Sequence, residues 1–422
     1  MMRRLSVERI VLAIFSFSVF CNSYFMLMWS TYNNRVISLL AQVIAYVGTF
    51  LLLVFIIVSS TNKGKVYKSV LFIFALVILL EFHMNVFGAE NTFPFTLAEF
   101  RFIVSILTLF LLSNEQRRTI FQYIVKLFAI MVLPSVVYFL LNSVGVHLPY
   151  SVLNSEQSSK ILNGTYYQHY PFGLIVSSPW TMSRLCGLFD EPGVVGTLSA
   201  IFISTNYDKI SKKWTLLLLI EGILSFSMAF YLLMLIYIIV RAFLHGAIRF
   251  TVTLSALVIM FLVFINTDFN NEYISSIQAR IDVTSTYLFI DNRTSDSFDQ
   301  EFSNFVEKGG YPLYMGNGKG SVSSNAVMSS SFSYKCLLYD YGIIGSILYL
   351  LVFFVTAFYF KIKRRNIPFL LVFLASIYQR PYVFNLQYYT IFVTALSFLE
   401  NELTDFGVRM KRIQNNEWST EN

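Results

Sequence analysis

A short polar stretch interrupts the apolar sequence near its middle. Residues 183–200, SRLCGLFDEPGVVGTLSA, bring Arg184, Asp190 and Glu191 together just ahead of an apolar run. Side chains of these types can bind anions and transfer protons, and ionisable groups at membrane depth mark a functional site by default. The alternative is a plain helix start at Pro192, where the acids interact favourably with the helix dipole and Arg184 is a nearby counter-ion.

Composition places these residues in a membrane protein. The chain has 422 residues, of which 56% are hydrophobic and 17% aromatic, and its mean hydropathy is +0.61. Apolar runs of about 20 residues, the length that crosses a ~30 Å hydrocarbon core, recur along it. The net charge of +7 does not indicate nucleic-acid binding, because the basic residues gather in short loops between these runs. Three cysteines without a CxxC spacing argue against a metal or disulfide framework.

Twelve apolar segments predict an all-α polytopic membrane protein, a single integral membrane domain over 1–422. The stretch from Trp214 to Val240 could form one long helix or two short ones that meet at SFS, residues 225–227. Two crossings place most of the 31 basic residues on one side, which the positive-inside rule makes cytoplasmic. Both termini are then cytoplasmic, including a short tail at 401–422. The segments lie near 10–30, 36–59, 69–88, 98–112, 119–146, 190–205, 214–227, 229–243, 248–266, 341–360, 367–383 and 384–400.

This topology leaves two long segments outside, 147–189 and 267–340. The second is rich in Ser, Asn, Gly and Asp, and loops of such length are usually functional or disordered. Mixed apolar and polar residues at 273–281 and 298–306 predict short helices on the membrane surface. The glycine-rich GNGKG at 316–320 could expose backbone N–H groups to phosphate, although an ordinary turn also explains it.

The stretch from Arg184 to Gly193 resembles the R-x-x-G-x-F-x-E-P-G signature of bacterial O-antigen and capsular polysaccharide repeat-unit polymerases, the Wzy family, which is related to the O-antigen ligases. The second long loop adds DNR at 291–293, then GNGKG, then SYKCLLYDYGIIG at 333–345, in an order similar to that of the family. The resemblance implies a membrane fold like that of GT-C glycosyltransferases. It also implies a location in the bacterial plasma (inner) membrane.

The resemblance implies a metal-independent glycosyltransferase without a cofactor. Its donor would be a growing glycan on a polyprenyl diphosphate, and its acceptor a hydroxyl of another lipid-linked unit at the outer face. A cationic clamp would hold the diphosphate, because the planar guanidinium group of arginine binds phosphate oxygens bidentately. Arg184 and Arg293 match family positions and are the first choices for it. Glu191, with Asp190 second, would take the acceptor proton, since burial can raise the pKa of an acid.

Further outward-facing residues could bind the same substrate. Arg380 in YQRPY and Arg101 in AEFRF should lie close to the interface, although their head groups could simply reach lipid phosphates. Arg280 also lies on the outer side. Lys335 and Tyr334 precede an apolar segment, where they could bind substrate or anchor the interface.

The other acids and the histidines bear on three questions: which residue is the base, whether the chain is a polymerase or a ligase, and whether a metal takes part. Asp291 and Asp340 stay possible bases, whereas Glu81 and Glu221 lie mid-span and more commonly form structural hydrogen bonds. All four histidines lie outside 267–340, and the ligase branch typically has one there, so polymerase is favoured over ligase. The sequence shows no His, Asp and Glu cluster typical of a catalytic metal.

A flippase or other transporter is the second alternative, although no two related halves are visible. The expected partners are a polyprenyl-diphosphate-linked oligosaccharide, membrane lipids and a chain-length regulator protein, without nucleic acid.

Overall fold

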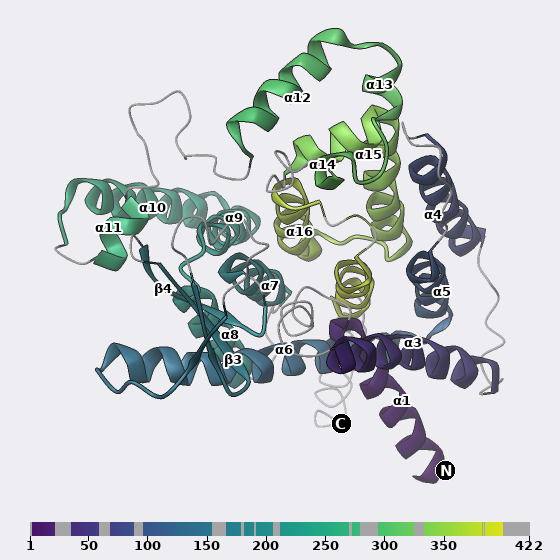
Figure 1. Ribbon diagram of the computed structural model, residues 1–422, viewed down its shortest axis with the longest axis horizontal. Helices are drawn as coiled ribbons and strands as arrows, with labels where there is room; N and C mark the ends of the chain where they lie inside the picture. Colours follow the sequence, from purple (N-terminus) through teal and green to yellow (C-terminus); the bar gives the residue numbers. More distant parts are fainter. Residues whose placement is uncertain are drawn as a thin grey trace, which may run out of the picture.

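The computed structural model shows a mainly helical protein with one small β-sheet (Figure 1). The residues that it describes are 2–21, 35–58, 68–87, 96–153, 166–178, 181–189, 191–205, 212–269, 272–278, 294–324, 333–381, 383 and 385–399.

A helix overlaps each of the twelve apolar segments. The helices are α1 Met2–Cys21, α3 Arg35–Val58, α4 Lys68–Val86, α5 Leu97–Leu111, α6 Asn114–Ser143, α7 Pro192–Ser204, α8 Lys212–Leu224, α9 Met228–Leu244, α10 Ala247–Asn266, α15 Tyr334–Tyr359, α16 Ile367–Gln379 and Leu386–Leu399, called here the last helix. A short 3-10 helix, η2 Arg364–Asn366, precedes α16. Among the described residues, six helices are long and apolar enough to cross a membrane. The helical membrane class is therefore confirmed, and the number of crossings stays a prediction.

The segment from Trp214 to Val240 forms two helices. α8 ends at Leu224 and α9 begins at Met228, and Phe226 between them has a positive φ of 45°. A Cβ atom added to Gly196 of α7 would lie 2.7 Å from the Cβ of Ser227. The glycine therefore lets α7 pack directly against the break.

A four-stranded antiparallel sheet occupies part of 147–189, where the sequence predicts only a loop. The strands follow one another in space as they do in sequence. Arg184 lies opposite Val176, and Pro171 and Phe172 form the turn between the second and third strands. The sheet is an addition to the predicted helical fold. Its strands are β1 Ser151–Leu153, β2 Tyr166–Tyr170, β3 Gly173–Ser178 and β4 Thr181–Gly187.

Ser135 of α6 holds the sheet in place. Its Oγ accepts a hydrogen bond from the Leu174 N–H (3.0 Å) and donates one to the Gly187 carbonyl (3.2 Å). Gly187 has a φ of 66°, and a Cβ there would lie 3.0 Å from a methyl group of Val132. β4 therefore ends against α6, and the chain turns from there toward α7.

Short helices form in the second long segment, and two of them overlap the predicted stretches 273–281 and 298–306, of which 279–281 lie outside the described residues. α11 is Glu272–Gln278, α12 is Asp296–Lys308, α13 is Gly310–Met315 and α14 is Ser321–Ser324. α12 lies along the upper edge of the molecule in Figure 1. Phe298 and Phe305 on its buried face pack against the ring of Tyr339 in α15, with centroid distances of 5.8 and 5.0 Å.

Arg117 joins four helix ends. Its Nη1 donates to the carbonyl oxygens of Leu109 and Phe110 at the end of α5, at 3.1 and 3.3 Å. Its Nε donates to Ser397 Oγ near the end of the last helix (3.1 Å), and its guanidinium group lies over the Phe360 ring at the end of α15. Arg117 itself belongs to the first turn of α6, so these ends meet at one place.

Candidate functional site

Glu191 and Arg380 form an ion pair between two helix ends. Glu191 is the N-cap residue of α7, and Arg380 is the C-cap residue of α16. The Glu191 side chain caps no backbone N–H, and its Oε2 instead accepts a hydrogen bond from Arg380 Nη2. The Arg380 side chain is only 5% exposed, whereas that of Glu191 is 27% exposed. The pair is therefore accessible from the carboxylate side.

Local sequence signals place both residues at these ends. Pro192 occupies the first turn of α7, where its missing N–H leaves no hydrogen bond unmade. On the other side, the Arg380 N–H closes α16 by donating to the Ser376 carbonyl (2.8 Å). Asn385 Oδ1 then accepts from the Gln387 N–H (2.9 Å) and starts the last helix. Arg380 thus lies in a short connection between two helices.

The first turn of α15 lies beside this connection. The ring of Tyr334 stacks on that of Tyr378, with centroids 4.6 Å apart and an angle of 13° between the rings. Tyr378 precedes Arg380 by two residues, and Lys335 follows Tyr334. Tyr334, one of the predicted substrate-binding residues, therefore contacts the last turn of the helix that ends at Arg380, and Lys335 is its neighbour in the chain.

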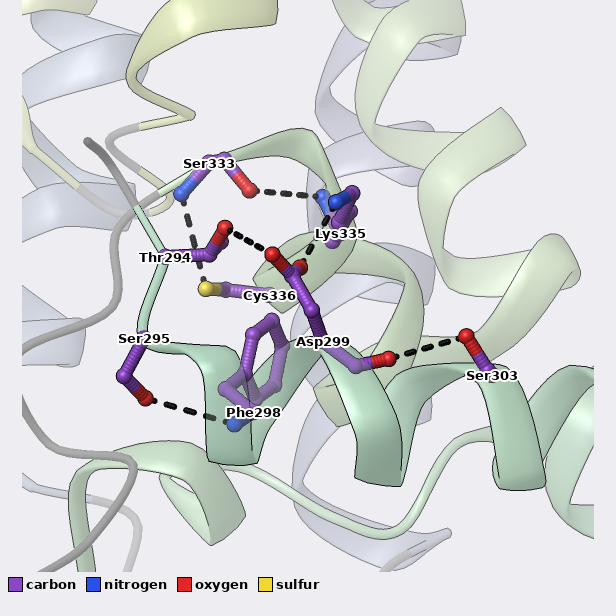
Figure 2. A network of polar contacts seen from close by, with 8 residues as sticks. All are labelled: Thr294, Ser295, Phe298, Asp299, Ser303, Ser333, Lys335 and Cys336. Carbon is purple, nitrogen blue, oxygen red and sulfur yellow. Dashed lines mark hydrogen bonds and ion pairs between the residues drawn. The ribbon is translucent and has the colours of Figure 1, made fainter. Parts of the chain in front are cut away.

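Lys335 ties α12 to α15 (Figure 2). Its Nζ lies 2.7 Å from Asp299 Oδ1, and the Thr294 hydroxyl donates to Asp299 Oδ2 at 2.9 Å. Ser295 caps the same helix by accepting from the Phe298 N–H. The Lys335 ammonium group thus links the two helices, and the side chain as a whole stays 22% exposed.

Arg184 lies on β4, which packs against α6 and α7. Its side chain is half-buried, and its Nε is buried without a hydrogen-bond partner among the described residues. A buried polar atom of this kind usually meets a water molecule or a ligand. The guanidinium group of Arg184 is thus suited to bind an anion.

Arg101 turns into the protein. It is 5% exposed, and its guanidinium carbon lies 5.4 Å from the ring centroid of Tyr46 in α3. A buried position does not fit the alternative that its head group reaches lipid phosphates. The ring contact joins α5 to α3 and does not join Arg101 to the Glu191 and Arg380 pair.

The remaining predicted residues, Asp190, Arg280 and Arg293, lie outside the described part of the chain, as does Asp291. The described chain resumes at Thr294, directly after Arg293. The roles of these residues stay predictions.

The GNGKG segment at 316–320 is a turn whose backbone is already engaged. The Gly318 N–H donates to the Asp340 carbonyl (2.9 Å), and the Asn317 N–H donates to the preceding carbonyl of α15 (2.9 Å). The Asp340 carboxylate accepts from the Val322 N–H (3.0 Å). This geometry favours the ordinary turn over the phosphate cradle, and it gives Asp340 a structural role.

An ionic cluster that sequence reasoning missed lies on the other side of α15. Lys319 pairs with Glu99 at the start of α5, which is 4% exposed. Burial lowers the pKa of Lys319, and the carboxylate of Glu81 in α4 acts against that shift. The local sequence carries one signal here: Thr96 is followed three residues later by Glu99, and the two form the capping box that the structure shows. That signal predicts a helix start and says nothing about Lys319.

No protein-family model matches the sequence, and comparison with curated proteins gives no match. Within the described ranges, no group of three or more His, Cys, Asp and Glu side chains could hold a metal ion. The site assembled here consists of an arginine paired with a partly exposed carboxylate, beside Tyr334 and Lys335. Such an arrangement can bind an anionic group and accept a proton.

Proposed function

We propose that the protein polymerises lipid-linked oligosaccharide repeat units at the outer face of a bacterial plasma membrane. The observation that carries the proposal is the pairing of Glu191 and Arg380 where α7 begins and α16 ends, beside the first turn of α15. A cation that can bind a diphosphate and a carboxylate that can accept a hydroxyl proton thus lie side by side in a largely apolar helical protein.

In the proposed reaction, Arg380 and Arg184 bind phosphate oxygens of the polyprenyl-diphosphate donor. Binding draws Arg380 away from Glu191, and the carboxylate becomes more basic because it loses its counter-ion. The oxygen of the acceptor hydroxyl forms a bond with the anomeric carbon of the donor. The bond between that carbon and the diphosphate oxygen breaks, its electron pair leaves with the lipid diphosphate, and the hydroxyl proton passes to Glu191.

The test uses the purified protein in lipid vesicles with polyprenyl-diphosphate repeat units and no nucleotide. The wild-type protein should produce a ladder of longer, still lipid-linked glycans, because the diphosphate leaving group supplies the driving force. Glu191→Gln should lower the rate of extension by roughly 10²–10⁴-fold, the usual contribution of a general base, with a smaller effect on KM. Glu307→Gln, at an exposed acid of α12, is the matched control and should extend the glycans at the wild-type rate.

Two outcomes would replace the proposal. Repeat units that cross the bilayer without being extended would identify a transporter. Transfer of the glycan only to a different acceptor, with no ladder from repeat units alone, would identify a ligase.

A further inference from the structure

Residues 314–322, called here the brace, are packed onto α15 through their backbone. Gly342 interrupts α15 with a φ of 64°, and the place of a Cβ there is taken by backbone atoms of Tyr314 and Gly316. A Cβ on Gly316 would in turn meet the backbone of Asp340. The N–H groups of Asn317, Gly318 and Val322 also donate hydrogen bonds to α15. The brace and this part of α15 therefore form one unit.

Lys319 connects the brace to two other helices. Its ammonium group pairs with Glu99 of α5 and lies within electrostatic range of Glu81 of α4. The two acids are 4% and 3% exposed, whereas Lys319 is 36% exposed. Buried carboxylates are costly without a counter-ion. The lysine therefore has a strong electrostatic reason to stay between α4 and α5 and hold the brace against them.

The same part of α15 lies close to the candidate site. Tyr341 O and His83 Nε2 of α4 are 3.1 Å apart, which adds a second link at the kink. Tyr334, which stacks on Tyr378, begins this helix six residues before Asp340, a distance of about 9 Å along the axis. A change in the angle of this short helical stretch would move Tyr334 and Lys335 relative to Arg380.

We propose that Lys319 is a positioning residue for the reaction proposed above. By pairing with Glu99 of α5, and by its electrostatic attraction to Glu81 of α4, it holds the brace against these helices, and the brace fixes the first turn of α15 beside the end of α16. Lys319 acts through α15 and does not touch the substrate. The inference rests on the proposed function only for its kinetic consequence, because the pairing itself can be tested without activity.

The structural test uses Cys336 in the first turn of α15 as the reporter. Its side chain is half-buried, and its Sγ accepts a hydrogen bond from the Ser333 N–H (3.4 Å). In a protein in which alanine replaces Cys21 and Cys186, a maleimide reports how often this turn opens. Lys319→Met should speed the labelling of Cys336 roughly tenfold, which corresponds to a loss of about 1.4 kcal/mol of ion-pair stabilisation. Lys319→Arg should label at about the parent rate.

Two further variants guard against misfolding and general charge effects. Glu99→Gln removes the charge but keeps a side chain that can complete the capping box, so it should loosen the turn without breaking α5. Lys308→Met, at an exposed lysine of α12, is the matched control and should leave the labelling rate unchanged.

The kinetic test measures ladder formation in vesicles. Lys319→Met should raise KM for the lipid-linked unit about tenfold with little change in kcat, and Lys319→Arg should restore the parent KM. If labelling of Cys336 is unchanged in both Lys319→Met and Glu99→Gln, the positioning role is wrong. Faster labelling with unchanged KM would also overturn it. If the wild-type protein forms no ladder, the proposed function fails, and the labelling result still decides whether Lys319 holds α15.

Discussion

Two buried arginines have different kinds of hydrogen-bond partner. Arg117 donates hydrogen bonds to neutral groups, among them the carbonyl oxygens at the end of α5 and the Ser397 hydroxyl. Arg380 is instead paired with the side-chain carboxyl group of Glu191, which is partly exposed. Carbonyl groups fixed in a helix cannot be displaced, whereas an incoming anion can take the place of a carboxylate. Arg380 is therefore the arginine suited to bind a substrate.

Replacing Arg380 by lysine should separate these roles. Lysine keeps the charge but loses the planar fork, so Arg380→Lys should slow ladder formation at least about tenfold while the protein still folds. Arg117→Lys is the matched control, and it should lower the thermal stability in detergent while the folded fraction keeps its specific activity. Equal loss of activity per folded molecule in both variants would show that Arg380 has no special role.

At the level of single residues, sequence reasoning found the types but not the partners. Arg184 and Glu191 are predicted from a polar stretch that resembles a family signature, and Arg380 from its place near the membrane interface. The structure places two of the three in one ion pair. The pairing itself could not be predicted, because Arg380 reaches Glu191 only through the packing of α16 on α7. Lys319 was missed for the same reason, since its partners Glu99 and Glu81 come from distant helices.

At the level of elements, the sequence predicts where the helices lie, but it does not predict the strands. Long apolar segments locate α3, α4, α6, α9, α10 and α15 by composition alone. The hairpin of β2 and β3 lacks the usual signal, because Phe172 occupies a position with a φ of 58° where Gly or Asn is typical. The sheet is stabilised by its contact with α6, above all by Ser135. A contact between distant segments of this kind leaves no local pattern in the sequence.

Ser135→Ala should therefore destabilise the attachment of the sheet. The substitution leaves the buried N–H of Leu174 without its acceptor, which costs about 1–3 kcal/mol. Ser143→Ala in the same helix is the control, because Ser143 Oγ only donates back to the Phe139 carbonyl of its own helix. Its effect should stay within about 0.5 kcal/mol. Unfolding of both purified variants in detergent measures the difference, and similar values would show that Ser135 does not hold the sheet.

At the level of the whole molecule, the helix ends meet in two groups. The ends of α5, α15 and the last helix meet the start of α6 at Arg117. The start of α7, the end of α16 and the start of α15 meet near Glu191 and Arg380. Each group therefore contains the ends of some helices and the starts of others. Placing most basic residues on one side, with two helices between Trp214 and Val240, puts each of these groups on a single side of the membrane.

This agreement leads to a prediction about sidedness. Lys308 in α12 and Lys363 between α15 and α16 are both exposed, and the charge distribution places Lys308 outside and Lys363 inside. In a protein without native cysteines, Lys308→Cys should react with an impermeant maleimide added to intact cells, and Lys363→Cys should react only after permeabilisation. If α8 and α9 together crossed the membrane only once, every later segment would change sides and the two results would be exchanged. That exchange would also place the first turn of α15 and Arg380 on the cytoplasmic side, where an outward-facing polymerase could not use them.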